Sequence, residues 1–149
     1  MAPSYTPIAL QHVNLVVPRG TLHVAKEFYG EVIGFASDPV PQLQKDVLLW
    51  FRIGDGPQQI HVAFEGVKDH PSPSPISSRH PCFSLASPEA LLALQQRMYE
   101  HSLSGAESAA QQCDKPGAEN SGAKGVEYPT RFFARDYAGN RLEFAVASS

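Results

Sequence analysis

The chain repeats one pattern twice, and this internal repeat constrains its fold more than any other feature. Each half opens with a β-rich run that begins at a histidine, His12 in HVNLVV and His80 in HPCFSL, followed by a turn and a helical-looking segment. Each half closes on a run in which a potential metal ligand is flanked by apolar residues, His61 in QIHVAF and Glu143 in RLEFAV. Such self-similarity indicates two copies of one supersecondary unit.

Composition limits the classes of protein that this chain can belong to. Its 149 residues, 42% of them hydrophobic, are enough for one domain built of two repeats. A formal charge of −3, with scattered Lys and Arg, argues against a nucleic-acid partner. The N-terminal residues do not resemble a signal peptide and no apolar run has membrane-spanning length, so we expect a cytoplasmic protein without a membrane partner. Cys82 and Cys113 are expected to be free thiols.

The first module is expected over about residues 8–65. Gly34 should stop its helix, and the turn residues 54–57, Gly-Asp-Gly-Pro, predict a hairpin. Prolines among serines in residues 66–79 predict an extended linker to the second half. The predicted elements of this module are a strand over 8–17, a helix over 21–33 and strands over 47–53 and 58–64.

The second module is expected over about residues 80–147. Ser87, Pro88 and Glu89 combine a cap, a first-turn proline and an acid, which predicts a helix ending near His101. The polar segment 102–125 lengthens this half and is expected to be a mobile insertion, so that shortening it should preserve folding. The other predicted elements are a strand opening at His80 and strands over 128–135 and 140–146.

Strand alternation predicts where the potential ligands point. In the first strand the apolar residues share one phase, which leaves His12 on the opposite face, and the same reasoning applies to His61, His80 and Glu143. All four therefore avoid the face expected to contact the helices and are predicted to line one concave face. By the same rule, the further residues of that cavity are Trp50, Arg52, Arg131 and Phe133.

Three imidazoles and one carboxylate suit a single divalent ion, namely Zn, Ni, Co, Fe or Mn. Any one of these histidines alone is ordinarily a half-buried or surface residue. Four potential ligands on matching strand phases favour a metal site, with His12, His61, His80 and Glu143 as the ligands. An inherited pocket that holds no metal is the alternative.

Five segments together resemble the vicinal oxygen chelate superfamily, also called the glyoxalase/bleomycin-resistance/dioxygenase superfamily. They are QHVNLVVP, AKEFYGEVIGF, WFRIGDGPQQIHVAFE, RHPCFSLASPEALLALQQRM and TRFFARDYAGNRLEF, and they span nearly the whole chain. The resemblance implies an α+β fold of two βαβββ modules, whose mixed sheet curls around a metal-binding cavity with ligands on the first and fourth strands of each module. It also implies a homodimer, although two modules of one chain can complete such a site.

The chain departs from the family pattern at two places. His61 stands where metal-binding glyoxalase I proteins often have an acid, and Asp136-Tyr137 replaces the usual Asp-Pro. The resemblance is therefore to glyoxalase-like proteins rather than to lactoylglutathione lyase itself.

These observations predict a glyoxalase-like lyase or isomerase that acts on a small substrate. A divalent ion would hold two neighbouring substrate oxygens and stabilise an enolate or enediolate, while Glu143, as ligand and base, moves the proton. Arginines in the cavity would pair with a substrate anion and its aromatic side chains would cover an apolar portion. An Fe(II)-dependent dioxygenase and a non-catalytic small-molecule-binding protein of the bleomycin-resistance type are the alternatives. The predicted substrate-binding residues are Trp50, Arg52, Arg131 and Phe133.

Overall fold

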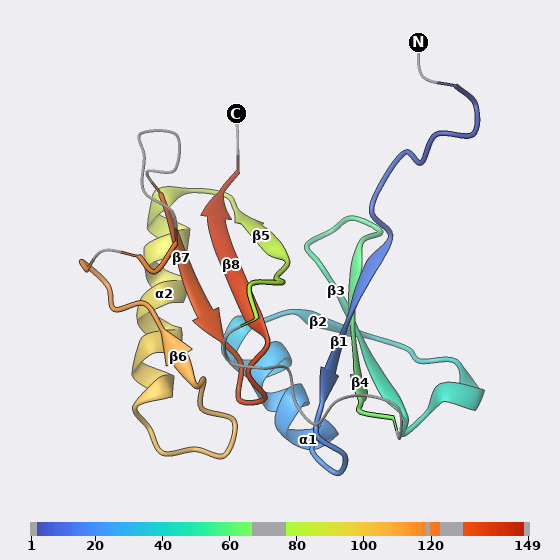
Figure 1. Cartoon of the computed structure of the whole chain (residues 1–149), viewed down its shortest axis with the longest axis horizontal. Coiled ribbons are helices and arrows are strands. Elements are labelled where there is room, and N and C mark those ends of the chain that lie inside the picture. Colours follow the sequence, from blue (N-terminus) through green and yellow to red (C-terminus); the bar gives the residue numbers. More distant parts are fainter. Residues whose placement is uncertain (1–2, 67–76, 119, 123–129, 148–149) are drawn as a thin grey trace.

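The structure, a computed structural model, describes residues 3–66, 77–118, 120–122 and 130–147. Two modules lie side by side, and each contains a four-stranded mixed sheet (Figure 1). This arrangement confirms the predicted α+β class and the two repeated modules. Within the described residues the two sheets are separate, and no helix is long and apolar enough to cross a membrane.

The first module forms a sheet of order β1-β4-β3-β2, in which β1 runs parallel to β4 and the other neighbours are antiparallel. The short strand β2 and the helix η2 were not predicted, because three residues are too few to show a hydrophobic period. The elements are β1 (His12–Val17), α1 (Leu22–Ala25), η1 (Lys26–Ile33), β2 (Ala36–Asp38), η2 (Gln42–Gln44), β3 (Leu48–Arg52) and β4 (Gln59–Phe64).

The helix predicted over residues 21–33 is present, as one α-helical turn that continues as the π-helix η1. It buries Phe28 and Tyr29 completely against the sheet. Gly34 ends it in the left-handed conformation, with φ of 95°, as predicted from the ability of glycine to adopt that region. The helix therefore ends where the sequence predicted, with its large aromatic side chains packed against the sheet.

The second module repeats this topology, with order β5-β8-β7-β6 and β5 parallel to β8. Its helix starts as predicted, because the Ser87 hydroxyl accepts a hydrogen bond from the Ala90 amide at 3.1 Å and Pro88 occupies the first turn. The elements are β5 (Cys82–Leu85), α2 (Pro88–Ser102), β6 (Gln112–Cys113), β7 (Arg131–Arg135) and β8 (Arg141–Val146).

The segment 102–125, expected to be a structureless insertion, contains β6. This strand pairs with β7, and Ser108 and Ala110 just before it are buried. The expectation failed because β6 has only two residues in polar surroundings, which gives no period to detect. Residues 119 and 123–129 of this region, and most of the linker predicted over 66–79, lie outside the described residues.

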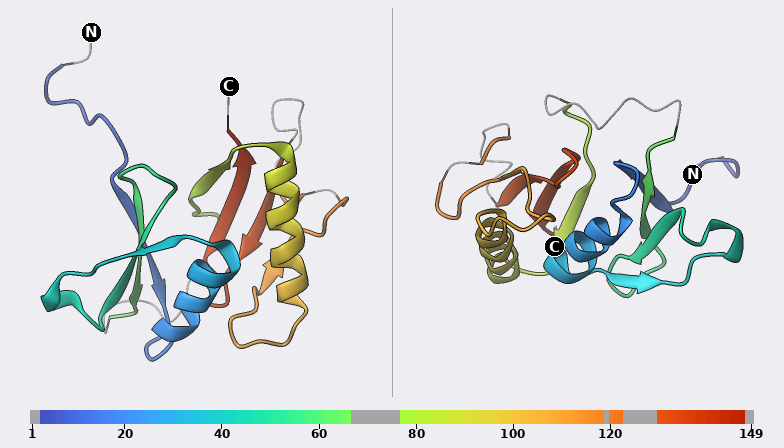
Figure 2. Two further views of the ribbon diagram at one scale, coloured as in Figure 1. Left: turned by 180° about the vertical axis from the view of Figure 1, so that it is seen from behind. Right: turned by 90° about the horizontal axis from the view of Figure 1, so that it is seen from below.

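The helix of the first module lies between the two sheets, whereas α2 flanks the second sheet toward the edge of the molecule (Figure 2). Helix η1 contacts α2, where the Arg97 guanidinium donates hydrogen bonds to the carbonyls of Val32 and Glu31, both at 2.9 Å. The rings of Phe35 and Phe83 also meet across the modules, 5.1 Å apart. Each sheet packs one face against the helices, and its other face is turned away from the described helices; we call that face the outward face.

The turn between β7 and β8 fastens the second module to the first. Asp136 is fully buried and accepts a 2.6 Å hydrogen bond from the Tyr29 hydroxyl, while Asn140 donates both to Asp136 and to the Val16 carbonyl. The hydroxyl of Tyr137 donates to the carbonyl of Thr21 at 2.9 Å. This buried, fully bonded turn fixes how the two sheets are oriented.

Candidate functional site

Three parallel rings stand on the outward face of the first sheet. His12 on β1 and His61 on β4 stack with centroids 4.1 Å apart and planes 13° from parallel. Trp50, the cross-strand neighbour of His61 on β3, stacks on its other side at 4.6 Å and 7°. Strand alternation predicted this shared face, and the structure places His12, His61 and Trp50 on it together.

A hydrogen-bond chain orients His61 within this stack. The amide nitrogen of Gln59 donates to Asp38 at 2.8 Å, so its oxygen faces His61 Nε2 at 2.9 Å and accepts from it. Since Nε2 carries the proton, Nδ1 is left with the lone pair. Burial, and then the neighbouring His12, lower the pKa of His61. A neutral imidazole with a fixed tautomer is the form that binds metal ions.

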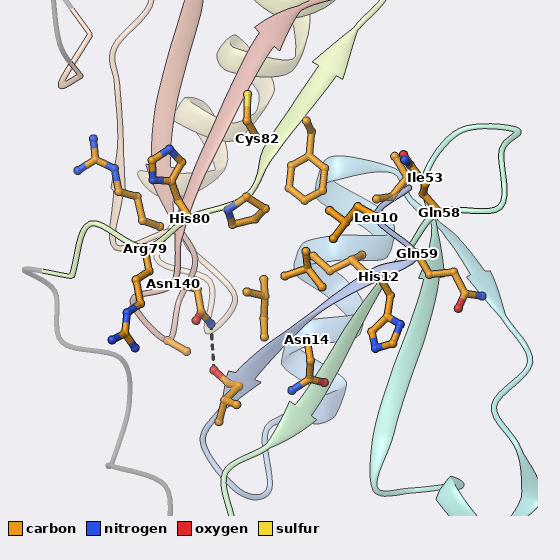
Figure 3. Close-up of a pocket in the computed structure, with 18 of the residues that line it drawn as sticks. Leu10, His12, Asn14, Ile53, Gln58, Gln59, Arg79, His80, Cys82 and Asn140 are labelled. Atoms are coloured by element: carbon orange, nitrogen blue, oxygen red, sulfur yellow. Dashed lines mark hydrogen bonds between the residues drawn. The ribbon is translucent and has the colours of Figure 1, made fainter. Parts of the chain in front are cut away.

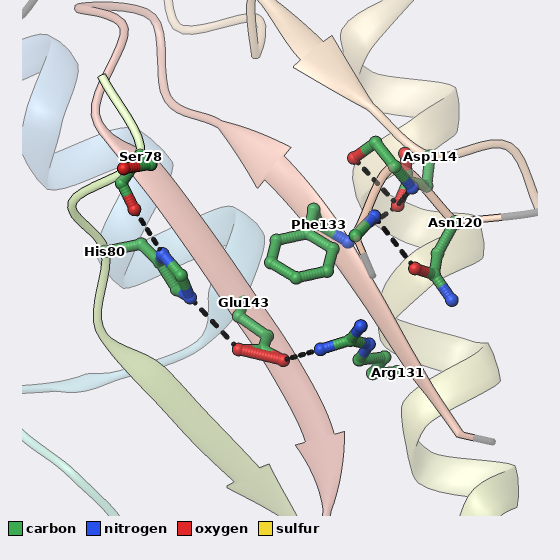
Figure 4. Close-up of polar contacts among 9 residues, drawn as sticks. Ser78, His80, Asp114, Asn120, Arg131, Phe133 and Glu143 are labelled. Carbon is green, nitrogen blue, oxygen red and sulfur yellow. Dashed lines mark hydrogen bonds and ion pairs between the residues drawn. The ribbon is translucent and has the colours of Figure 1, made fainter. Parts of the chain in front are cut away.

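The second sheet carries a different pair on its outward face. His80 Nε2 lies 3.1 Å from Glu143 Oε2, and Arg131 Nη1 lies 3.0 Å from the other carboxylate oxygen (Figure 4). His80 Nδ1 lies 2.7 Å from the Ser78 carbonyl oxygen. The side chains of Glu143 and Arg131 are 13% and 9% exposed, so this ion pair is largely shielded from water.

The hydrogen-bond partners of His80 determine whether a proton or a metal ion can bridge its ring and Glu143. A carbonyl oxygen only accepts, so Nδ1 carries a proton. Nε2 then faces a carboxylate oxygen, another acceptor, and this contact requires either a second proton on the ring or a cation shared by both groups. Two ligand atoms of one ion at 2.0–2.2 Å are themselves about 3 Å apart. The separation of Nε2 and Oε2 therefore fits a shared divalent ion.

The four predicted metal ligands form two pairs in the structure. Among the residues described, no three potential ligands come close enough together to hold an ion. A cleft of about 1440 Å³ separates β1 from β5, and both His12 and His80 line it. They lie on opposite walls, with the ring of His12 directed away from His80 (Figure 3). One chain thus presents two separate pairs of predicted ligands, which we call half-sites.

Comparisons with known proteins identify the architecture. No protein-family model matches the sequence, and comparison with curated proteins gives no match. A solved glyoxalase family protein from Bacillus anthracis is 25% identical, with 99% of this chain and 100% of that chain covered and a TM-score of 0.67. The chain has the vicinal oxygen chelate fold.

Two further structures share this fold. The fosfomycin resistance protein FosX from Listeria monocytogenes, solved with Mn(II) and 1S,2S-dihydroxypropylphosphonic acid, is 11% identical, with 96% and 95% of the two chains covered and a TM-score of 0.65. Lactoylglutathione lyase from Agrobacterium tumefaciens is 18% identical, with 95% and 96% covered and a TM-score of 0.62. The vicinal oxygen chelate resemblance predicted from the sequence is confirmed.

The predicted substrate-binding residues have partners within this vicinal oxygen chelate fold. Arg52 pairs with Asp38 at 3.2 Å, and Arg131 pairs with Glu143. Phe133 is buried, with its ring 5.5 Å from that of His80 in an edge-on arrangement. Both arginines therefore position other site groups, and their contact with substrate stays a prediction.

Cys82 belongs to the second half-site and was missed as a site residue. It is the cross-strand neighbour of Glu143 on β5 and lines the cleft. Partial burial, followed by the charge of Glu143 and a hydrogen bond to it, raises the pKa of Cys82 to about 11. Strand alternation could have identified Cys82, because it lies two positions after His80 and therefore shares the same face of the sheet.

Proposed function

We propose that this protein is a divalent-metal-dependent glyoxalase-like enzyme, a lyase or isomerase acting on a small substrate with two neighbouring oxygens. The observation that carries the proposal is the contact of His80 Nε2 with Glu143 Oε2 at 3.1 Å, while Nδ1 is committed to the Ser78 carbonyl. This contact requires either a second proton on the His80 ring or a cation shared by the two groups, and the proposal takes the shared cation. The Mn(II) in the FosX structure supports metal dependence within this fold.

The complete site belongs to a homodimer in this proposal. Each chain turns one half-site outward from each module, and a two-fold dimer brings the first module of one chain against the second module of its partner. His12 and His61 of one subunit then face His80 and Glu143 of the other. Two equivalent sites result, each with three histidines and one glutamate as ligands.

Individual residues of the site have distinct roles in the proposed reaction. A bound divalent ion would supply Lewis-acid stabilisation of negative charge on the substrate oxygens. Glu143 has a double role as ligand and base: its Oε2 would loosen from the ion and take the proton from the substrate carbon. Arg131 holds the other oxygen of Glu143, which fixes the orientation of that base. Trp50 supports His61 by stacking and offers an apolar edge to the substrate.

A non-catalytic small-molecule-binding protein is the second candidate, and the stack in the first module favours it. Parallel imidazole rings 4.1 Å apart hold their lone pairs in parallel planes, so the lone pairs of His12 and His61 do not converge on one point. Such a stack of rings can instead bind a flat ligand by aromatic stacking, without a metal. Metal content separates the two candidates.

Metal analysis after mild purification tests the proposal. We expect a stoichiometric divalent ion in the native chain, lost in the double variant His80→Ala, Glu143→Ala. The matched control is His23→Ala, Glu107→Ala, which removes an exposed His–Glu pair with a separation of 3.9 Å and should leave metal content unchanged. Equal metal content in both double variants would overturn the assignment.

Mixed dimers test the shared site. A chain lacking His12 and His61 is combined with a chain lacking His80 and Glu143, each as alanine variants. In a shared arrangement the mixed dimer has one intact site and one empty site, so metal binding and activity return on mixing. If each chain builds its own site, neither returns.

A further inference from the structure

Two arginines, Arg79 and Arg141, line one wall of the cleft between β1 and β5, and buried Arg135 supports them. Arg79 precedes His80, and Arg135 and Arg141 face each other across β7 and β8. We call these three residues the arginine wall. None of them forms an ion pair with a described residue, whereas Arg52 and Arg131 each have a carboxylate partner. In a chain with net charge −3, this is a local excess of positive charge.

Arg135 is the structural base of the arginine wall. It is only 6% exposed, and its guanidinium donates to the carbonyls of Gly139 at 3.0 Å and Ser77 at 2.9 Å. Burial, and then the charge of Arg141, lower the pKa of Arg135. The bond to Ser77 ties down the segment that leads to Arg79, so the positions of Arg79 and Arg141 depend on the same buried group.

The other two guanidinium groups have unused hydrogen-bonding capacity. Arg141 lies over the Phe133 ring, 4.3 Å from its centroid, and its buried Nε has no acceptor. Arg79 is exposed, and no described residue accepts a hydrogen bond from its side chain. Both residues line the cleft, where Figure 3 shows Arg79 beside His80 and Asn140. Polar groups without partners favour a ligand that supplies them.

We propose that the arginine wall binds a doubly charged oxyanion of the phosphate type, a phosphate monoester or a phosphonate, carried by a ligand in the cleft. Guanidinium groups bind such oxyanions through paired, charge-assisted hydrogen bonds. A single carboxylate would neutralise one charge, while Arg79 and Arg141 present two charges to the cleft with no acid of the described residues paired to either. Apolar residues of the opposite wall, among them Leu10, Val13 and Ile53, suit an organic body attached to the anion.

Titration with inorganic phosphate tests this inference on the metal-free full chain, so it does not depend on the proposed enzyme activity. At about pH 8, where phosphate is doubly charged, the ¹⁵N–¹H signals of the arginine Nε groups report binding. We expect Arg79→Gln and Arg141→Gln each to weaken binding about tenfold, since each removes a charge-assisted hydrogen bond. Acetate, as a monoanion, should bind more weakly than phosphate or sulfate.

The chain supplies a matched control in Arg19. Its guanidinium also lies 4.3 Å over a phenylalanine ring, that of Phe64, but it donates to the Glu65 carbonyl outside the arginine wall. Arg19→Gln should leave phosphate affinity unchanged. Equal weakening by Arg19→Gln, no effect of Arg79→Gln, or acetate binding as tightly as phosphate would each overturn the proposal. Arg79 is exposed, so its variant keeps the test valid if Arg141→Gln fails to fold.

Discussion

The two modules share a topology but hold their pairs of predicted metal ligands in different arrangements. In the first module, His12 and His61 lie flat against each other, and one ring must turn before both can bind one ion. In the second module, His80 and Glu143 already converge at 3.1 Å, held by Ser78 and Arg131. The repeated backbone thus sets where a ligand stands, while its neighbours decide whether it is ready to bind.

The largest expected difference between the modules concerns their connecting segments. Replacing residues 105–122 with a short Gly/Ser turn removes β6 and buried Ser108 and Ala110, and should lower the free energy of unfolding by roughly 3 kcal/mol. This reverses the expectation from sequence that the segment is dispensable. Urea unfolding measures the effect.

The first module provides the control for that deletion. Shortening residues 40–46, where Leu43 is 96% exposed, removes no sheet strand and should cost less than about 1 kcal/mol. Equal losses from the two deletions would mean that β6 contributes nothing to the second sheet.

The next prediction compares how much the two pairs of predicted ligands contribute to metal affinity. Because His12 must leave its stack to bind an ion, its net contribution to metal affinity is smaller than that of His80. We expect His80→Ala to lose about tenfold more affinity for Zn²⁺ than His12→Ala, the difference being the cost of breaking an aromatic stack. Calorimetric titration measures both variants, with His23→Ala as an exposed control. A larger loss from His12→Ala would reverse the comparison.

A smaller effect should appear in the pH dependence of stability. The folded pKa of His61 lies below its ordinary value of 6.5, so the unfolded chain binds more protons as the pH falls through that range. The unfolding free energy of the metal-free protein should therefore fall as the pH drops from the unfolded pKa toward the folded one. His61→Gln should flatten this decline, and His23→Gln should leave it unchanged. An unaltered slope in His61→Gln would show that the stack does not perturb His61.

The smallest effect is spectroscopic. Trp50 is the single tryptophan of the chain and stacks directly on His61, so its fluorescence reports on the first half-site alone. If the rings rearrange when a metal binds, emission should change with the same midpoint as metal binding. His80→Ala, Glu143→Ala should abolish that change. Emission that stays constant through full metal loading would mean that the stack remains intact.

The sequence predicted which residues share a sheet face, but it did not predict how the two sheets are oriented relative to each other. Alternation placed His12, His61 and Trp50 on one face because successive side chains of a strand point to opposite faces of the sheet. It did not indicate that the two sheets turn these faces outward, since helix packing between modules sets their orientation. The partner of Arg52 was missed because Asp38 lies on β2, a strand too short to predict. The arginine wall was missed because its members lie in three separate segments.

The turn that fastens the modules also has a consequence for how the protein unfolds. Tyr137, at the position where proline is usual in the family, bonds to Thr21 at the start of the first helix, and Asp136 bonds to Tyr29 within it. Opening either module would expose a buried carboxylate and strip the other module of its partners. We therefore expect the two repeats to unfold together as one cooperative unit.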